Sequence, residues 1–450
     1  MTFKNIATKF GVNKTIFYTS SSTSIAALGS LLSALLVIKF LSFEEQGFYY
    51  TFGSIVAIQI FFELGLNGII TQFVAHEFAN LSFDQEANII GSEYNKSRIS
   101  SLLHFCVKWY LLFSFGLFLA LLILGFVFFT KFQQNNININ WLMPWLLLSL
   151  VTALNLLLSP IIAFLQGLGK VKEIANFQLY SQFTRLVIVS TGLIFGLKLY
   201  VLGFGVFAIF IIMLINIARR FKIQLTTIWN IPITEKIHYY KEIFPYQWKI
   251  GLSWISGYFI FQLFNPVLFA SEGAKVAGQM GLTLTALNGI MTISFAWMTT
   301  KVPLFSTFIA RKEFYQLDKV FNKTFKQSFL INIFLLMFFY ILIFMIRYFN
   351  LTIGKNNISD RFIPNIPLIC MIVTVIINQV VSSWATYLRC HKKEPFLYNS
   401  IVGGLLTTLS TIYFGKNFGL NGITTGYFVI NIIMLPWAYY IYISKKQQWH

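Results

Sequence analysis

The stretch 40–77, FLSFEEQGFYYTFGSIVAIQIFFELGLNGIITQFVAHE, contains the pattern that decides the fold. A short acidic turn at Glu44–Glu45 leads into segment 48–70, where Glu63 is the single charged side chain. A helix needs about 20 mostly apolar residues to cross the hydrocarbon core of a bilayer. Segment 48–70 has that length and composition, so the sequence predicts a transmembrane helix there.

The same pattern recurs along the whole chain. We therefore predict an all-α polytopic membrane protein with about 12 transmembrane helices. The predicted spans are 17–41, 48–70, 103–129, 141–166, 177–197, 200–218, 248–270, 277–303, 328–349, 363–388, 397–415 and 419–443.

The composition excludes a soluble globular protein. Of the 450 residues, 56% are hydrophobic and 11% are charged, whereas soluble domains carry about 25% charged residues. The net charge of +19 comes from Lys and Arg in short segments between the apolar runs. Nucleic-acid binding requires a basic face on a folded domain, so the basic residues are interpreted as topology signals instead.

The basic residues also predict an orientation. With twelve spans and a cytoplasmic N-terminus, all but eight of the 34 Lys and Arg residues lie on the cytoplasmic side. The two most basic connections, 219–249 and 301–326, then face the cytoplasm, as positive segments usually do. The first apolar stretch, 17–41, is too long for a cleaved signal peptide. Both termini are therefore expected in the cytoplasm.

Segments at matching places suggest an internal duplication. FLQGLGKVKE at 164–173 and YLRCHKKEPF at 387–396 both end a helix and begin a basic connection. Because each half has an even number of helices, the halves enter the membrane in the same direction. We expect two parallel six-helix halves, 1–218 and 248–450, joined by a cytoplasmic linker loop, 219–247, with a central cavity at their interface.

The motifs of the first half resemble those of a known family. The acidic pair Glu44–Glu45, then Gly47–Phe48, then Glu63–Leu64–Gly65–Leu66, and the later loop Gln166–Gly167–Leu168–Gly169–Lys170 are similar to those of the oligosaccharide-lipid flippases. These O-antigen and capsule polysaccharide translocases belong to the multidrug, oligosaccharidyl-lipid and polysaccharide exporter superfamily. The resemblance covers nearly the whole chain.

The resemblance implies a function. Such a protein moves a polyprenyl-pyrophosphate-linked oligosaccharide across a bacterial inner (plasma) membrane by alternating access, for the biosynthesis of lipopolysaccharide O-antigen or capsule. Its partners are this lipid-linked sugar, the bilayer and other polysaccharide-assembly proteins. One departure disfavours lipid II as the substrate: related lipid II flippases carry arginines on helix 1, where this chain has Lys39 near the outer end.

Charged residues inside the predicted spans are candidates for substrate binding, because a charge at the centre of a bilayer costs at least about 2.5–3.5 kcal/mol. Glu63 is either a functional carboxylate or a hydrogen-bonded packing group. Arg185, two turns into its helix, either binds phosphate or extends to the inner surface. Lys39, Lys249 and Lys301 stand at helix ends, where a role as surface anchors competes with substrate binding.

Neutral polar residues inside the spans form a second group. Amides both donate and accept hydrogen bonds, so they suit sugar hydroxyls, but they also join helices to one another. Pro266 is expected to break its helix, which is tolerated where the backbone lines a cavity. The amide candidates are Gln59, Gln262, Asn265 and Asn288, with Asn378 and Gln379 as further members.

No catalytic residue, metal site or cofactor is expected. The five histidines and three cysteines lack ligand spacing, and flipping a lipid requires no covalent chemistry, so the chain is not interpreted as an enzyme. Two alternatives remain. A cation-coupled multidrug exporter of the same superfamily normally needs an acidic cluster in the membrane. A membrane glycosyltransferase or polymerase normally needs a sizeable outer loop with catalytic groups.

Overall fold

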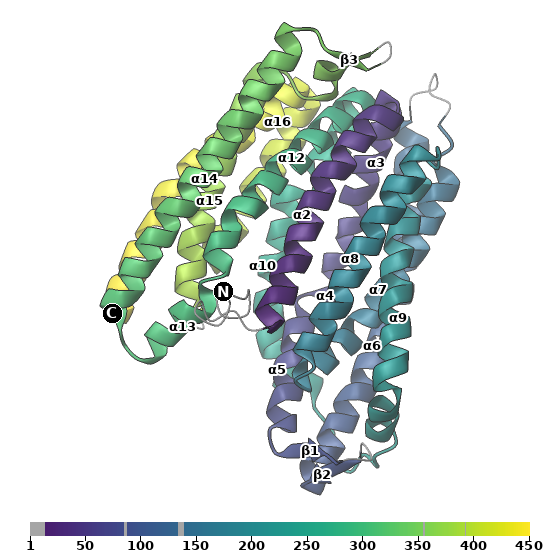
Figure 1. Cartoon of the computed structure of the whole chain (residues 1–450), viewed down its shortest axis with the longest axis vertical. Coiled ribbons are helices and arrows are strands. Elements are labelled where there is room, and N and C mark those ends of the chain that lie inside the picture. Colours follow the sequence, from purple (N-terminus) through teal and green to yellow (C-terminus); the bar gives the residue numbers. More distant parts are fainter. Residues whose placement is uncertain (1–13, 85–87, 134–138, 354–355, 392) are drawn as a thin grey trace, which may run out of the picture. The chain divides into compact units, whose positions relative to one another are not determined.

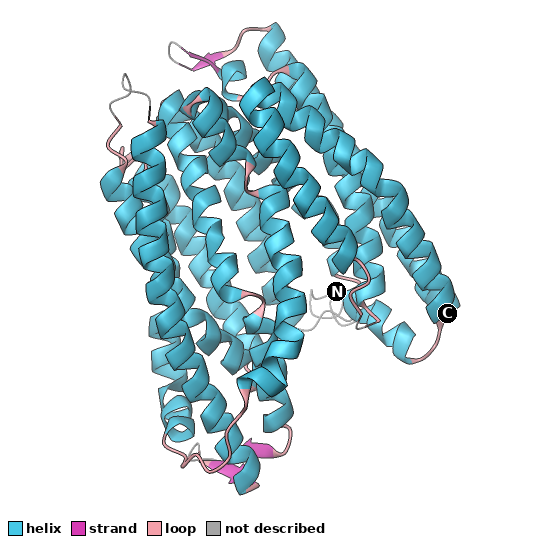
Figure 2. Ribbon diagram, turned by 180° about the vertical axis from the view of Figure 1, so that it is seen from behind, coloured by secondary structure: helices cyan, strands magenta, loops and turns pink. Residues whose placement is uncertain are grey.

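The structure is a computed structural model that describes residues 14–84, 88–133, 139–353, 356–391 and 393–450. Helices account for nearly all of these residues, and the strands form two short hairpins (Figures 1 and 2). The chain divides into two compact units. The first comprises Val56–Lys131, Asn140–Ile255 and the described part of Met1–Ala26; the second comprises Ala27–Ile55, Ser256–His450 and the described part of Phe132–Ile139.

The first unit is a bundle in which α7 packs against α5 and α9, while α8 packs against α9 (Figure 1). Its β1 and β2 form an antiparallel hairpin with Leu81 opposite Gly91. The elements are η1 (Ala57–Gln59), α4 (Ile60–Glu63), α5 (Leu66–Phe78), β1 (Leu81–Phe83), β2 (Ile89–Gly91), α6 (Glu93–Phe132), α7 (Leu142–Gly167), α8 (Val171–Ile194), α9 (Tyr200–Trp229) and η2 (Tyr239–Ile243).

In the second unit, α12 packs against α11, α14 and α15, and α15 packs against α16. Helices α2 (Lys14–Phe40) and α10 (Phe244–Phe261) are divided between the two units, while α3 and α6 each have only their last residue in the other unit. The remaining elements are α3 (Phe43–Val56), α11 (Phe264–Glu272), α12 (Ala274–Thr299), α13 (Val302–Ala310), α14 (Phe314–Tyr348), β3 (Thr352–Ile353), β4 (Asn356–Asn357), η3 (Ile358–Arg361), α15 (Asn365–Arg389) and α16 (Leu397–Trp449).

Glycines bring α3 and α12 into direct backbone contact inside the second unit. A Cβ atom added to Gly47 would lie 1.9 Å from the carbonyl oxygen of Ala274, and one added to Gly278 would lie 2.8 Å from the backbone nitrogen of Gly47. Small residues allow membrane helices to approach this closely, and close packing drives their association. The Gly47–Phe48 motif therefore serves helix packing.

The predicted span 48–70 is interrupted where its motif Glu63–Leu64–Gly65–Leu66 stands. The helix tightens at η1, and α4 then ends because Leu64 (φ 45°) and Gly65 (φ 70°) adopt left-handed conformations. Leucine adopts this conformation at a cost, because its Cβ approaches the following carbonyl, whereas glycine adopts it freely. A Cβ on Gly65 would also lie 2.3 Å from Cγ2 of Ile250. The motif thus encodes a break directly after Glu63.

The predicted boundary between spans 397–415 and 419–443 is confirmed as a sharp break within α16. Gly419 has φ 56° and ψ −137°, which is not helical. The carboxylate of Glu272 accepts a hydrogen bond from the backbone N–H of Leu420 at 2.9 Å. An acidic group there satisfies an N–H that the new helix start leaves unpaired.

The fold class is confirmed: the chain is an all-α, multi-pass membrane protein. Among the described residues, nine stretches of helix are long and apolar enough to span a bilayer. The broken α16 counts once among them, and α8 is not included because its polar side chains lower its mean hydropathy. The number of twelve spans therefore stays a prediction, as do the parallel halves and the cytoplasmic termini.

Several segments expected as loops are helical. Residues 219–229 continue α9, so the extended part of the predicted linker is confined to 230–238, and α13 and the first turns of α14 occupy much of 301–326. A helix satisfies its backbone hydrogen bonds internally. It therefore continues beyond the apolar span while its Lys and Arg side chains reach water.

Reporter fusions test the predicted orientation. A periplasm-active reporter placed after Lys131 or after Asn350 should give an external signal, and one placed within 230–238 should give a cytoplasmic signal, because all but eight Lys and Arg residues lie on the assigned inner side. A cytoplasmic signal after Lys131 or Asn350 would overturn the assignment.

Candidate functional site

The strongest candidate site is a polar cluster around Glu63 in the first unit. Glu63 is half-buried and is the last residue of α4, directly before the helix break. Asn67 Nδ2 donates to Glu63 Oε2 at 3.3 Å and to Ser159 Oγ at 2.6 Å. Tyr110 donates its hydroxyl proton to Asn67 Oδ1 at 3.0 Å. The cluster therefore joins the broken second span to α6 and α7.

The chemistry of this cluster centres on one carboxyl group. Among the described residues, Glu63 has no Lys or Arg ion-pair partner; its partner is the neutral amide of Asn67. Ionisable groups within membrane spans are rare because they are costly, and they usually mark an ion, proton or substrate pathway. The surrounding amide and hydroxyl groups can each donate and accept hydrogen bonds, which suits either a proton or a sugar hydroxyl.

The predicted cationic candidates are spread over the surface. Arg185 is exposed on α8, and its Nη1 donates to Gln182 Oε1 at 3.5 Å. Lys39 and Lys249 are exposed beside the rings of Phe40 and Trp248, and half-exposed Lys301 lies between α12 and α13. Within the first unit, neither Arg185 nor Lys249 forms an ion pair with Glu63. Their predicted contact with phosphate stays a prediction.

The amide candidates fall into two groups. Asn265 is buried, and its Nδ2 donates to Ser54 Oγ at 2.9 Å, so it joins α11 to α3. Gln379 is fully buried and donates to Ser328 Oγ at 2.6 Å, joining α15 to α14. These contacts match the helix-packing alternative. Asn288 is exposed, and Gln59 is half-buried in η1.

The break predicted at Pro266 is confirmed. Helix α10 ends at Phe261 and α11 begins at Phe264, so Gln262 lies in the interruption. Gln262 is four residues before Pro266, and a proline ring clashes with the carbonyl at that position in a continuous helix. Gln262 is half-buried there, and its carbonyl cannot accept a helical hydrogen bond from Pro266, which has no backbone N–H.

Arg361 has a role that the sequence analysis did not identify. It is 4% exposed and lies in the second unit, where its guanidinium donates to Leu41 O at 2.7 Å and to Gln46 Oε1 at 3.1 Å. Gln46 in turn donates to Gly278 O at 2.8 Å. Burial lowers the pKa of Arg361, and the nearby carboxylates Glu44 and Glu45 oppose that shift. Arg361 thus ties η3 to the α2–α3 turn.

A second unpredicted cluster holds the connection between the predicted halves. Arg98 at the start of α6 donates to Glu77 at 2.8 Å and to Glu242 at 2.5 Å. The hydroxyl of Ser97 accepts hydrogen bonds from the backbone N–H groups of Thr234 and Glu235, each at 2.8 Å. Segment 230–243 is therefore fastened to α6 within the first unit.

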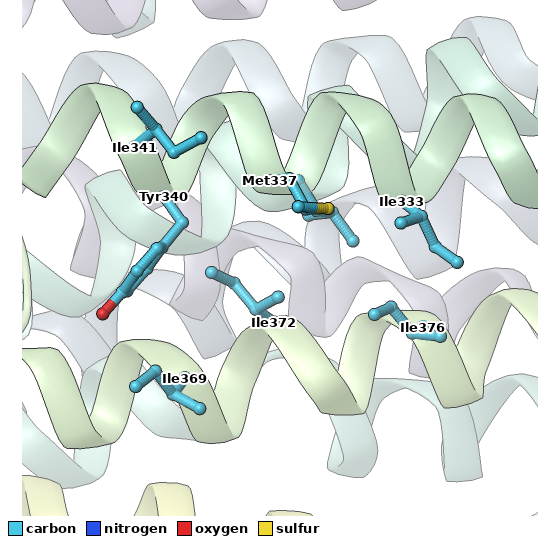
Figure 3. A pocket seen from close by; sticks show the side chains of 8 residues that line it. Ile333, Met337, Tyr340, Ile341, Ile369, Ile372 and Ile376 are labelled. Carbon is cyan, nitrogen blue, oxygen red and sulfur yellow. The ribbon is translucent and has the colours of Figure 1, made fainter.

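Apolar grooves are present in the second unit. One, of about 270 Å³, lies between α14 and α15 and is lined by aliphatic side chains such as Ile333 and Ile372, with Tyr340 at one side (Figure 3). Another, of about 700 Å³, lies between the two parts of α16 and includes Ser410 and Asn421. Their linings suit hydrocarbon better than a sugar or pyrophosphate, which need several polar partners.

Comparisons with known proteins identify the fold. No family model and no curated protein matches the sequence. An inward-facing multidrug resistance MATE transporter of the MOP superfamily matches with a TM-score of 0.61 and 13% identity, over 97% of this chain and 96% of that chain. A MOP superfamily transporter from Pyrococcus furiosus matches with a TM-score of 0.59 and 14% identity, over 96% and 95%.

A third match is a flippase. The inward closed conformation of the lipid II flippase MurJ matches with a TM-score of 0.56 and 14% identity, over 96% of this chain and 90% of that chain. At identities this low, the similarity describes the fold. The chain therefore has, over almost its whole length, the fold of the MOP superfamily transporters.

Proposed function

We propose that the chain is a flippase, not an enzyme, that moves a polyprenyl-pyrophosphate-linked oligosaccharide across the bacterial inner membrane. One observation carries the proposal: a transporter fold that also serves a lipid flippase here contains a cluster of one carboxyl, one amide and two hydroxyl groups. Such a set of hydrogen-bond donors and acceptors suits sugar hydroxyls. The cargo would be destined for O-antigen or capsule.

The physical task explains the demand for polar groups. The prenyl chain of the cargo can stay in the bilayer, but its sugars and pyrophosphate must cross hydrocarbon. A polar group moved there without a hydrogen-bond partner costs roughly 2–7 kcal/mol, so several sugars require a hydrated, polar path. We propose that alternating access between two six-helix halves provides this path and that the Glu63 cluster lines it.

The alternative is a cation-coupled multidrug exporter. Two observations favour it: MATE transporters share the fold, and Glu63 is a half-buried carboxyl with a neutral partner, which suits proton exchange. We rank it second because a single carboxylate with neutral neighbours is a weak site for a cation.

A gene deletion distinguishes the two functions. Under the flippase proposal, the deletion strain loses surface polysaccharide, accumulates the lipid-linked oligosaccharide on the cytoplasmic side and keeps its drug susceptibility. The wild-type gene restores the polysaccharide. Increased drug susceptibility with unchanged surface polysaccharide would instead support the exporter.

Arg185 provides a residue-level test. Arg185→Ala should abolish surface polysaccharide, because the Arg185 guanidinium is the proposed ligand for the phosphate. The protein level should stay normal, because Arg185 is exposed and bonds weakly to Gln182 within the protein. Arg185→Lys should restore function only in part, since lysine lacks the planar fork that binds a phosphate through two hydrogen bonds. Arg219→Ala is the matched control, because Arg219 is exposed in the C-terminal part of α9. Full function in Arg185→Ala would contradict phosphate binding by Arg185.

A further inference from the structure

Two histidines meet where α15 and α16 end in the second unit. His391 follows α15, and His450 follows α16. Their Nε2 atoms lie 3.2 Å apart although the residues are 59 positions apart in sequence. The hydroxyl oxygen of Tyr387 is 3.4 Å from His450 Nε2 and donates to Asp318 Oδ1 at 2.5 Å. The Nε2 atom of His450 therefore lies close to both a second imidazole nitrogen and a phenol oxygen.

We propose that His391 and His450 bind a divalent transition metal ion of the zinc class, with the Tyr387 oxygen as a further ligand. Zinc binds imidazole nitrogen at about 2.0–2.1 Å in tetrahedral geometry, which places two such nitrogens about 3.3 Å apart. The observed separation of 3.2 Å matches this value. Imidazole is a preferred ligand for zinc, copper and nickel, and the half-exposed site leaves room for water as the fourth ligand.

The surroundings hold the ligands in place. Phe314 stacks on the His450 ring at 4.2 Å between centroids, and Trp449 lies 5.1 Å from the His391 ring. Asp318, which accepts the Tyr387 proton, also pairs with Lys446 at 2.8 Å. A carboxylate that holds a ligand is the usual outer partner of a metal site and increases the basicity of that ligand. A bound ion would fasten the end of α16 to the end of α15.

Metal titration tests the proposal on the full chain, purified in detergent without a polyhistidine tag. The wild type should bind one Zn²⁺ per chain and unfold at a higher temperature when Zn²⁺ is present, because a ligand that binds the folded state stabilises it. Bound Co²⁺ should show the strong visible absorption of tetrahedral coordination. His391→Gln and His450→Gln should each weaken binding by more than about tenfold, the effect that even outer partners of a metal produce.

His76→Gln is the matched control, because His76 is exposed on α5 in the other unit; it should bind Zn²⁺ like the wild type. Tyr387→Phe keeps the ring and removes the hydroxyl, so it should weaken binding and change the Co²⁺ spectrum. The proposal fails if the wild type does not bind Zn²⁺, or if binding survives in both His391→Gln and His450→Gln. His450 lies at an exposed helix end, so its variant remains informative if His391→Gln does not fold.

Discussion

Reconstituted vesicles with a membrane potential of 100 mV, negative on the cytoplasmic side of the protein, are expected to export the lipid-linked oligosaccharide without a pH gradient. The pyrophosphate carries about two negative charges, and each gains about 2.3 kcal/mol per 100 mV when it crosses the full field. The gain of about 4.6 kcal/mol biases net export by a factor of more than about 10³.

Glu63→Gln tests whether the carboxyl group takes part. The substitution keeps the shape of the side chain and an oxygen that can still accept the hydrogen bond from Asn67. Under the proposed mechanism, wild type and Glu63→Gln export equally when a potential alone is imposed, because no proton needs to be carried. Flipping is measured as the fraction of lipid-linked sugar that becomes accessible to an external lectin or glycosidase.

Glu93→Gln is the control for removing a carboxylate, because the Glu93 side chain is 86% exposed at the start of α6. It should transport like the wild type under every condition. If transport depends on a pH gradient and is lost in Glu63→Gln but not in Glu93→Gln, Glu63 carries a proton and export driven by potential alone is wrong. That result would contradict the proposed driving force but not the proposed lipid-linked substrate.

Arg98→Ala is expected to produce the largest loss of stability. The Arg98 side chain is 12% exposed and pairs with Glu77 (6% exposed) and Glu242 (27% exposed). Removing one partner of a buried ion pair costs about 3–5 kcal/mol, because it leaves buried charge unpaired. Here two carboxylates lose their cation, and segment 230–243 loses one attachment to α6. Thermal unfolding of the purified protein in detergent measures the effect.

The matched control is Arg220→Ala. The Arg220 side chain is 59% exposed, and its guanidinium lies 3.8 Å from Glu173; exposed pairs contribute about 0–1 kcal/mol. Equal destabilisation in the two variants would contradict the assigned role of the Arg98 cluster.

The same cluster predicts a dependence on pH. Burial alone would raise the pKa of Glu242, but hydrogen bonds from Arg98 and the His238 backbone outweigh it and lower that pKa. The resulting stabilisation is present above the ordinary pKa of a glutamate and is lost as the pH falls through the lowered value. Arg98→Ala should therefore lose less stability on acidification than the wild type does.

The sequence determined the membrane-spanning class and two of the helix breaks, at Pro266 and between spans 397–415 and 419–443, but not the break after Glu63. Both depend on local properties: an apolar run of sufficient length requires a helix in lipid, Pro266 excludes the hydrogen bond to Gln262, and Gly419 permits a conformation that other residues resist. The sequence analysis placed 219–229 in a loop because its Lys and Arg residues indicate contact with water. The structure shows that α9 continues through this segment, since contact with water does not end a helix.

Only the tertiary structure decided which polar residues hold the fold together. In the sequence, nothing distinguished Arg361 from the other Lys and Arg residues predicted on the outer side. Its partners Gln46 and Leu41 lie 315 and 320 positions away in the chain. Asn265 and Gln379 resembled sugar ligands, but they join helices. A hydrogen bond depends on which helix faces meet, and hydropathy does not specify that in lipid, because every face of such a helix can be apolar. Glu63 could be identified from its sequence context alone; its pairing with Asn67, and through Asn67 with Tyr110 and Ser159, required the fold.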